Sequence, residues 1–547
     1  MNQPEGTVAK KAIVKERIDE LLSRFNRSDE PGLVVGVVAQ GKTIYRRGFG
    51  LASVEQGVAN QPFTRFRIGS TSKHFACLAV MLLVEEGKLD IDASVRRIVP
   101  ELPPEVGEPT LRQFMTHTSG LRDFLDLSFL TDGVGVKPQG YALKQQLRLS
   151  GRNDAPGQMV NYNNGGYQLL SLVIDRVAGM PMEQFVRQRI FEPMAMSNTS
   201  WAGSDLDVVP GLAALHVPRG DGGWRKGLFP YEDMRAEGGM VSTVDDLLRW
   251  LAHLRCDAKV VGSTQSWRQM IAPAALVSGE KVPYAFGLFS QSYRGLPVIH
   301  HGGGVLGGAC QMITVPTHAL DIVILTNGAL VNPSDLAESI IDVVLEDEAL
   351  EARVAPAMAA PYRALVGKSY RSATSDLVVR FDEMAGTVLA SVFNTPLPLV
   401  PLDGDLIVPF EKIVAGPLVF RMAGLPRLAE EAPNEIVLDE GSLSWTLSLV
   451  TASTLTAPEE IVGHYAIPEL GSDAEVSVVD GKLQLLVQGR YGHGAYFLHA
   501  VDRDAFLCDY AVAFPLRGTL TVERSGDNVT GLSYSSLRTR GLKFVRR

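Results

Sequence analysis

The chain has 547 residues, of which 46% are hydrophobic and 21% charged. This is the balance of a packed globular protein, and it excludes a disordered, collagen-like or disulfide-framework chain. The 52 Lys and Arg residues against 61 Asp and Glu give a net charge of −9, which disfavours nucleic acid or an anionic membrane as the main partner. At roughly 150 residues per domain, we expect three or four domains.

Neither the apolar runs nor the cysteines indicate export or insertion in a membrane. The longest apolar run, Phe75 to Val84, is ten residues long, about half of what a membrane-spanning helix needs. The N-terminal stretch of residues 1–22 carries charges where a signal peptide has its apolar segment. The four cysteines form no CxxC pair, so we expect reduced, mostly buried thiols in a cytoplasmic protein.

In chain order, the first 350 residues alternate between helical and strand patterns. Two β-rich runs, 33–39 and 43–47, are joined across Gln40-Gly41 and predict a hairpin. A second group of short β-rich runs lies between Tyr284 and Asn327. Helices are expected at 9–26, 70–86, 165–178, 182–192, 244–254 and 334–350. Consecutive strands at short spacing indicate an antiparallel sheet, so the predicted class is α+β.

Beyond residue 350 the helical patterns almost vanish. Residues 351–361, rich in Ala and Pro, are typical of a linker. The motif at 365–370 returns at 461–465, and each copy precedes an alternating β run, which makes a repeat of about 95 residues. A second linker is expected at 450–459. We therefore predict three domains, with two small antiparallel β-barrel domains following the first: 1–350, 362–450 and 458–547.

The most informative motif is Ser70-Thr71-Ser72-Lys73, at the start of an apolar helix pattern. Residues three apart share a helix face, so the Ser70 hydroxyl and Lys73 amine would be neighbours. A serine needs such a base to act as a nucleophile. The ordinary alternative is an N-cap serine followed by a surface lysine. The same spacing recurs at Ser278 and Lys281, but Gly279 and Pro283 predict a turn there.

Two further stretches carry candidate residues. In Tyr162-Asn163-Asn164 the tyrosine could relay a proton and the amide at Asn164 could hold a substrate amide, although an ordinary turn has the same composition. The β run 298–304 ends in glycines at 302–304, where a substrate backbone could pair and an N–H could stabilise an oxyanion.

Three competing site types find little support in the sequence. Adjacent His300 and His301 point to opposite faces of a strand, and no HExxH or Cys/His cluster is present, so no metal site is expected. Residues 302–307 satisfy G-x-G-x-x-G, but a hairpin pattern and not a helix follows them, so no dinucleotide or other cofactor is expected. The chain also lacks the G-x-S-x-G elbow of α/β-hydrolases.

Taken in order, these pieces resemble the serine β-lactamase and penicillin-binding-protein superfamily: S-x-x-K, then Y-x-N, then a Lys- or His-x-Gly strand. Supporting stretches of this resemblance are 48–52, 117–121 (HTSGL), 190–194, 238–243 and 284–288. The resemblance implies a β-lactamase-like catalytic domain in which Ser70 forms an acyl-enzyme and Lys73 and Tyr162 transfer protons.

The resemblance also implies the binding roles. Asn164 would bind the substrate amide, and the N–H groups of Ser70 and Gly304, beside Gly303, would form the oxyanion hole. His301 stands where β-lactamases carry a lysine, which argues against an enzyme that must hold a carboxylate there. β-Lactams are expected to be slow inhibitors.

Two related β domains after a catalytic domain with H-G-G resemble the three-domain D-aminopeptidases, over the whole chain. This implies a cytoplasmic homodimer that acts on small peptides or amino-acid amides. It also implies that a third-domain loop, 489–496 with Arg490, Tyr491 and His493, reaches the catalytic cleft. Alternatives are an esterase or amidase, a penicillin-binding DD-peptidase-like enzyme, or a non-catalytic penicillin-binding protein.

Overall fold

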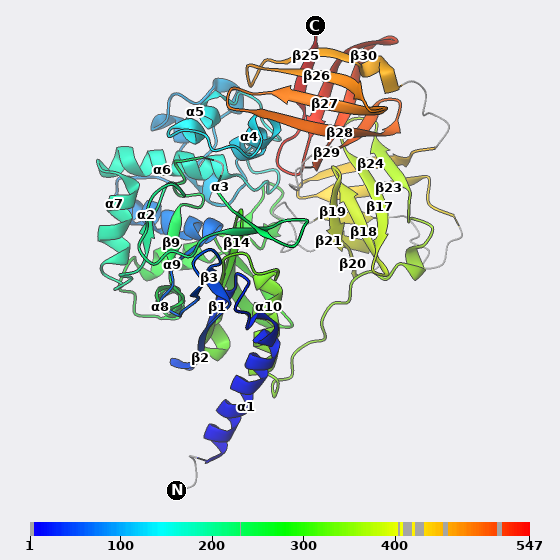
Figure 1. The fold of residues 1–547 in the computed structure, drawn as a ribbon. Coiled ribbons are helices and arrows are strands. Elements are labelled where there is room, and N and C mark those ends of the chain that lie inside the picture. The colour runs from blue at the N-terminus through cyan, green and yellow to red at the C-terminus, as the bar shows by residue number, and fades with distance from the viewer. Residues whose placement is uncertain are drawn as a thin grey trace.

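The computed structural model describes residues 5–229, 231–402, 405–408, 418–421, 431–451, 458–510 and 517–547. Figure 1 shows a mixed helix-and-strand region in blue to green beside two regions built almost entirely of strands. The predicted linker at 450–459 falls largely outside the described residues. In the part of the chain that is described, no helix is both long and apolar enough to cross a membrane.

A six-stranded antiparallel sheet forms the centre of the first region. Its strands, in spatial order, are β12 (Phe289–Tyr293), β13 (Leu296–Val305), β14 (Gly308–Val315), β15 (Leu320–Thr326), β1 (Leu33–Ala39) and β2 (Lys42–Phe49). Positive φ angles at Gln40 and Gly41 make the two-residue turn that joins β1 to β2.

Helices cover both faces of this sheet. They are α1 (Glu5–Leu22), α2 (Lys73–Glu85), α3 (Leu111–Met115), α4 (Phe124–Asp132), α5 (Tyr141–Arg148), α6 (Asn164–Ala178), α7 (Met182–Val186, continued by a π-helical turn to Phe191), α8 (Val244–Arg255), α9 (Thr264–Met270) and α10 (Pro333–Val344).

Strand β1 shows why the sheet needs cover on both sides. Val34 packs into the core that contains α2, α6 and α8, whereas Leu33, Val35 and Val37 pack against α1 and α10 on the other face. All four side chains are fully buried, so a continuous apolar run forms a strand here instead of an alternating one. Short strands connect these elements: β3 (Leu51–Ser53), β4 (Val58–Ala59), β5 (Phe66–Arg67), β6 (Ser200–Trp201), β7 (His216–Pro218), β8 (Trp224–Lys226), β9 (Met240–Ser242), β10 (Ala274–Ala275) and β11 (Lys281–Val282).

The middle region is a nine-stranded antiparallel sheet that curls into a nearly closed barrel. Its strands are β16 (Ser369–Ser372), β17 (Val378–Met384), β18 (Thr387–Val392), β19 (Thr395–Pro398), β20 (Val400–Leu402), β21 (Asp405–Val408), β22 (Leu418–Arg421), β23 (Glu435–Glu440) and β24 (Leu443–Leu449).

The last region is a closed eight-stranded barrel. Its strands are β25 (Gly463–Ile467), β26 (Ser472–Val479), β27 (Lys482–Gln488), β28 (His493–Asp502), β29 (Ala505–Tyr510), β30 (Arg517–Ser525), β31 (Asn528–Ser535) and β32 (Leu542–Arg546). The predicted class, α+β followed by two antiparallel barrels, is confirmed.

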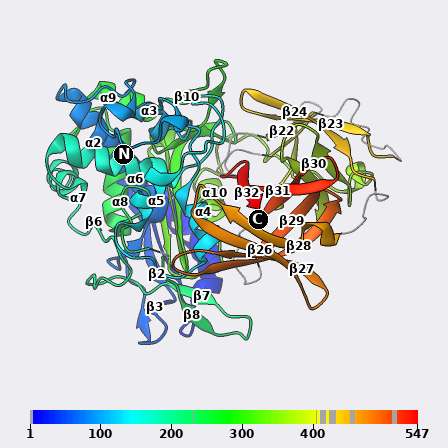
Figure 2. The ribbon, with the colours of Figure 1, turned by 90° about the horizontal axis from the view of Figure 1, so that it is seen from above.

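The internal repeat appears in the first strand of each barrel. Tyr370 in β16 and Tyr465 in β25 occupy matching places and are both fully buried. The C-terminal barrel lies against α4 and α5, as the two orthogonal views show (Figures 1 and 2). Its interior shares one apolar core with Phe124 and Leu130 of α4. The C-terminal barrel is therefore packed directly against a helix that leads to the candidate site.

Some element boundaries differ from the expectations. The helix expected at 334–350 ends at Val344, and the one expected at 9–26 ends at Leu22 and continues as a 3₁₀ turn. The helix expected from Ser70 begins at Lys73, and Gly69–Ser72 form a 3₁₀ turn before it. The four cysteines are free, and three of them are buried.

Candidate active site

Ser70 and Lys73 are brought together where the 3₁₀ turn enters α2. The Nζ atom of Lys73 lies 3.1 Å from Oγ of Ser70, because residues three apart eclipse in a 3₁₀ turn. The same Nζ donates to Oδ1 of Asn164 at 3.0 Å and to the carbonyl of Glu237 at 2.6 Å. Lys73 is fully buried, so it is not the surface lysine of the alternative interpretation.

Burial also changes the acidity of Lys73. Loss of hydration lowers the pKa of this ammonium, although the carboxylates of Glu237 and Asp123 act in the opposite direction. A lysine with a lowered pKa is more readily available as a neutral amine, which is the form that can accept a proton from a serine hydroxyl.

Tyr162 and Asn164 lie on the other side of Lys73. The Nζ of Lys73 is 4.7 Å from the centroid of the Tyr162 ring, and Tyr162 is buried. Burial raises the pKa of its phenol, while a hydrogen bond with Ser70 lowers it. Asn164, the first residue of α6, accepts from Lys73 and donates from Nδ2 to Asp123 at 2.9 Å. All four predicted polar side chains therefore meet at one place.

The glycines of β13 allow the 3₁₀ turn to approach this strand closely. A Cβ atom at Gly303 would lie 1.8 Å from the carbonyl oxygen of Ile68. Gly69 has a φ of +50°, and a Cβ there would lie 2.8 Å from the backbone nitrogen of Gly304. Strand β12 pairs with β13 only as far as His300, so residues 301–305 have no strand partner on that side among the described residues.

His301 is a neutral side chain in this structure. Its Nδ1 is 2.5 Å from the carbonyl oxygen of Gly302, which can only accept, so Nδ1 carries the proton. Its Nε2 then accepts from the hydroxyl of Tyr284 at 3.0 Å. Burial, with the nearby Lys73, lowers the pKa of His301 to about 3. His301 therefore supplies no positive charge with which to bind a substrate carboxylate.

Ser70 opens into a cleft of about 500 Å³. The predicted residues that line it are Ser70, Tyr162, Asn164, His301, Gly303 and Gly304. Lys73 lies below them, and the side chains of Leu125 and Phe129 on α4 form one wall.

Three side chains that sequence reasoning missed also belong to this site. Asp123, the N-cap of α4, accepts from the backbone N–H and the side chain of Asn164 and orients it. Glu237 is buried; its Oε1 accepts from Tyr231, Gln168 and a backbone N–H, and burial raises the pKa of its carboxyl. Arg538 reaches the cleft from the C-terminal barrel. None of the three stands in a recognisable motif, so the sequence alone offers no signal for them.

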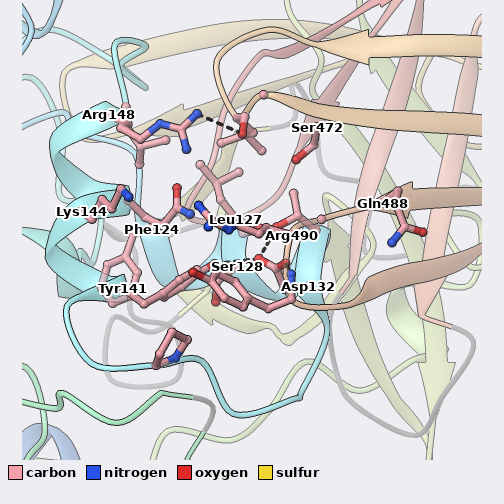
Figure 3. A pocket seen from close by; sticks show the side chains of 18 of the residues that line it. Phe124, Leu127, Ser128, Asp132, Tyr141, Lys144, Arg148, Ser472, Gln488 and Arg490 are labelled. Atoms are coloured by element: carbon pink, nitrogen blue, oxygen red, sulfur yellow. Dashed lines mark hydrogen bonds between the residues drawn. The ribbon is translucent and has the colours of Figure 1, made fainter.

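The third-domain loop lies elsewhere, which corrects the expectation for 489–496. Strands β27 and β28 leave only a short turn between Gln488 and His493. The backbone N–H of Tyr491 donates to Asp132 at the end of α4, at 2.7 Å. Arg490 and Tyr491 line a second cavity of about 690 Å³ between α4, α5 and the barrel (Figure 3). Neither they nor His493 line the cleft of Ser70.

In the described part of the chain, no three His, Cys, Asp or Glu side chains gather in a way that could hold a metal ion.

Comparisons with known proteins agree with this geometry. The family model described as Beta-lactamase matches residues 14–344. A D-aminopeptidase of Brucella canis is 25% identical over 388 residues, covering 69% of this chain and 70% of the relative. A D-aminopeptidase of Cereibacter sphaeroides is 26% identical over 532 residues, covering 94% of this chain and 96% of the relative.

Solved structures share the fold. The octameric penicillin-binding protein homologue from Pyrococcus abyssi has a TM-score of 0.55 at 21% identity and covers 79% of this chain and 99% of its own. The D-amino acid amidase from Ochrobactrum anthropi, complexed with D-phenylalanine, has a TM-score of 0.52 at 21% identity and covers 62% of this chain and 100% of its own.

Proposed function

The chain belongs to the β-lactamase family of the serine β-lactamase and penicillin-binding-protein superfamily, and on that premise we propose that it is a serine hydrolase that acts through an acyl-enzyme on Ser70. The observation that carries the proposal is the 3.1 Å separation of Lys73 Nζ and Ser70 Oγ, at the floor of an open cleft. A buried amine beside a partly exposed hydroxyl is the arrangement that nucleophilic catalysis requires.

In acylation, neutral Lys73 takes the proton of Ser70 while Oγ attacks the substrate carbonyl carbon. The N–H groups of Ser70 and Gly304 stabilise the resulting oxyanion. When the C–N bond breaks, the phenol of Tyr162 gives its proton to the leaving amine and recovers one from Lys73. The directions of the two pKa shifts support this division of roles, because burial favours a neutral Lys73 and a protonated Tyr162.

Deacylation reverses these transfers. A water molecule gives a proton to the Tyr162–Lys73 pair and attacks the ester carbonyl, the ester C–O bond breaks, and Ser70 regains its proton. Asn164, fixed by Lys73 and Asp123, keeps a second N–H for the substrate amide. Asp123 and Glu237 act as positioning residues, since they orient Asn164 and the peptide that accepts from Lys73.

The activity we propose is that of a D-aminopeptidase, which releases N-terminal D-amino acids from peptides, amides or esters. The proposal is supported by relatives of that name, one of them matched over 94% of this chain. The fold shared with a D-amino acid amidase agrees with it. The neutral state of His301 separates this site from those that bind a carboxylate with a lysine at this position.

One panel of substrates tests this. The p-nitroanilides of D-alanine and L-alanine, run beside p-nitrophenyl acetate, should show turnover of the D-anilide well above that of the L-anilide, and none by Ser70→Ala. Turnover of the ester alone would identify an esterase. Intact-protein mass spectrometry with a β-lactam should show slow formation of one adduct on the Ser70 peptide, whereas rapid β-lactam turnover would contradict the assignment.

We also propose a cytoplasmic homodimer with domains near 1–350, 362–450 and 458–547. Free and mostly buried cysteines support a reducing compartment. The six-stranded sheet, the nine-stranded sheet and the closed barrel share no strand, which supports the domain limits. Light scattering on the purified chain measures the oligomeric state, and limited proteolysis at 351–361 tests the first boundary.

A further inference from the structure

The loop that does enter the cleft from the C-terminal barrel is 536–541, between β31 and β32. Seven hydrogen bonds between described residues fix it to the first region. Its carbonyls accept from Asn161 (3.2 Å), from Asn153 (2.8 Å) and from Arg122 (2.9, 3.0 and 3.2 Å). The backbone N–H of Arg540 donates to Asn153 at 2.8 Å, and the hydroxyl of Ser536 donates to Asp126 at 2.6 Å. These bonds therefore fix the backbone of Arg538 beside the cleft.

The guanidinium of Arg538 contacts Tyr162 and Asp123 and still has N–H groups that can bind a ligand. Its Cζ lies 5.2 Å from the centroid of the Tyr162 ring. Its Nη1 forms an ion pair with Oδ2 of Asp123 at 3.9 Å, beyond hydrogen-bond distance, and Asn164 donates to the same oxygen. Among the described residues, no hydrogen bond engages the guanidinium, whose side chain is 30% exposed.

Arg538 and Glu237 are the charged residue types among the described residues that line the cleft, and burial raises the pKa of the Glu237 carboxyl. Of these described residues, Arg538 is the only Arg or Lys. His301 is neutral because burial lowers its pKa to about 3, so that its Nε2 accepts from Tyr284. An arginine fork with free N–H groups binds a carboxylate through paired, charge-assisted hydrogen bonds.

We propose that Arg538 is a specificity-determining residue that binds the carboxylate of the leaving amino acid, so that the preferred substrates are dipeptides and not neutral amides. This rests on the proposed function. Tyr162 hands its proton to the leaving amine, and in a dipeptide the free carboxylate is attached to the carbon next to that amine. Arg538 lies over the Tyr162 ring. The phenol can therefore face the leaving amine while the guanidinium faces the neighbouring carboxylate.

The test uses two substrates that differ only in this charge: D-alanyl-glycine and D-alanyl-glycinamide. The wild type should prefer the dipeptide in kcat/KM by about 10- to 100-fold, the range of a charge-assisted hydrogen bond. Arg538→Met should abolish that preference by raising KM for the dipeptide, so that kcat/KM becomes equal for the two substrates. Arg538→Lys should recover part of it. Lys144→Met, an exposed cation on α5 outside the cleft, should change neither value.

Retention of the preference in Arg538→Met, or an equal loss on both substrates, would overturn the proposal. D-Glutamic acid α-p-nitroanilide carries its carboxylate on the acyl side; sensitivity to Arg538→Met with this substrate alone would overturn the placement on the leaving side. Calorimetric titration of Ser70→Ala separates this proposal from the reaction. If it binds D-alanyl-glycine more tightly than the amide, and Ser70→Ala/Arg538→Met does not, Arg538 binds the anion even where the wild type hydrolyses neither. Equal binding by Ser70→Ala refutes the anion site.

Discussion

The Nζ of Lys73 lies 3.1 Å from Oγ of Ser70, whereas Ser278 and Lys281, at the same spacing, stand in an exposed turn and a short strand. Gly279, with a φ of +86°, prevents a helix from forming between them. The chain thus contains both a buried Ser–Lys pair and an internal control with the same spacing.

Ser70→Ala should lower kcat by several orders of magnitude, on the order of 10⁴ to 10⁶, because it removes the proposed nucleophile, the hydroxyl 3.1 Å from the buried Lys73 amine. Ser278→Ala should leave kcat within about twofold, because its hydroxyl bonds only the local turn. Steady-state kinetics on D-alanine p-nitroanilide gives both numbers. Equal activities would mean that Ser70 is not the nucleophile.

The pH profile of kcat/KM should be bell-shaped, with an acid limb at a lower pH than a lysine base ordinarily gives. Burial lowers the pKa of Lys73 from 10.5, so the neutral base is gained, and activity rises, at a pH well below that value. Burial raises the pKa of Tyr162 above 10.0, so its proton is lost, and activity falls, only above that pH. Tyr162→Phe should remove the alkaline limb. An acid limb near pH 10 would exclude Lys73 as the base.

Gly303→Ala and Gly304→Ala form a matched pair on β13. The first should destabilise the fold by about 1–3 kcal/mol, because its Cβ would overlap the carbonyl oxygen of Ile68. The second has nothing within 4 Å of its Cβ, so it should unfold close to wild type while its methyl group obstructs the cleft and lowers kcat/KM by about tenfold or more. Chemical denaturation and kinetics on both variants check this, and the opposite assignment of the two effects would refute it.

Gly489→Ala tests the corrected placement of the barrel turn. Its Cβ would lie 2.2 Å from Oδ1 of Asp132 and 2.7 Å from the carbonyl oxygen of Thr131. We expect a loss of about 1–3 kcal/mol in the free energy of unfolding, with an unchanged ratio of kcat/KM for blocked and unblocked substrates. Gly220→Ala, where a Cβ meets nothing within 4 Å, is the control. A change in that ratio would mean that this turn influences substrate selection in the cleft of Ser70.

The sequence predicts the proximity of Ser70 and Lys73 because their local spacing determines it. S-x-x-K before an apolar run leaves little choice about where Ser70 and Lys73 lie, and strands of alternating or continuous apolar residues predict the sheet. The turn at 489–492 shows the limit of such reasoning. Glycines at 489, 492 and 494 suggest a loop that extends into a cleft, whereas each permits close packing against the end of α4. Glycine composition alone does not distinguish reach from contact.

Arg538 could not be predicted for a different reason. Its role depends on hydrogen bonds from Asn153, Asn161 and Arg122, which lie more than 370 residues away along the chain, and no local pattern encodes such a pairing. Asp123 and Glu237 are similar cases, because their partners come from other elements.

The docking of 536–541 also has a consequence for biosynthesis. Ser70, Lys73 and Tyr162 are translated long before Arg538, so a growing chain acquires the proposed nucleophile and proton carriers first and the proposed charge selection late. A ribosome-bound intermediate, or a molecule nicked between β31 and β32, would keep the reacting groups while lacking the residue that sorts substrates by charge.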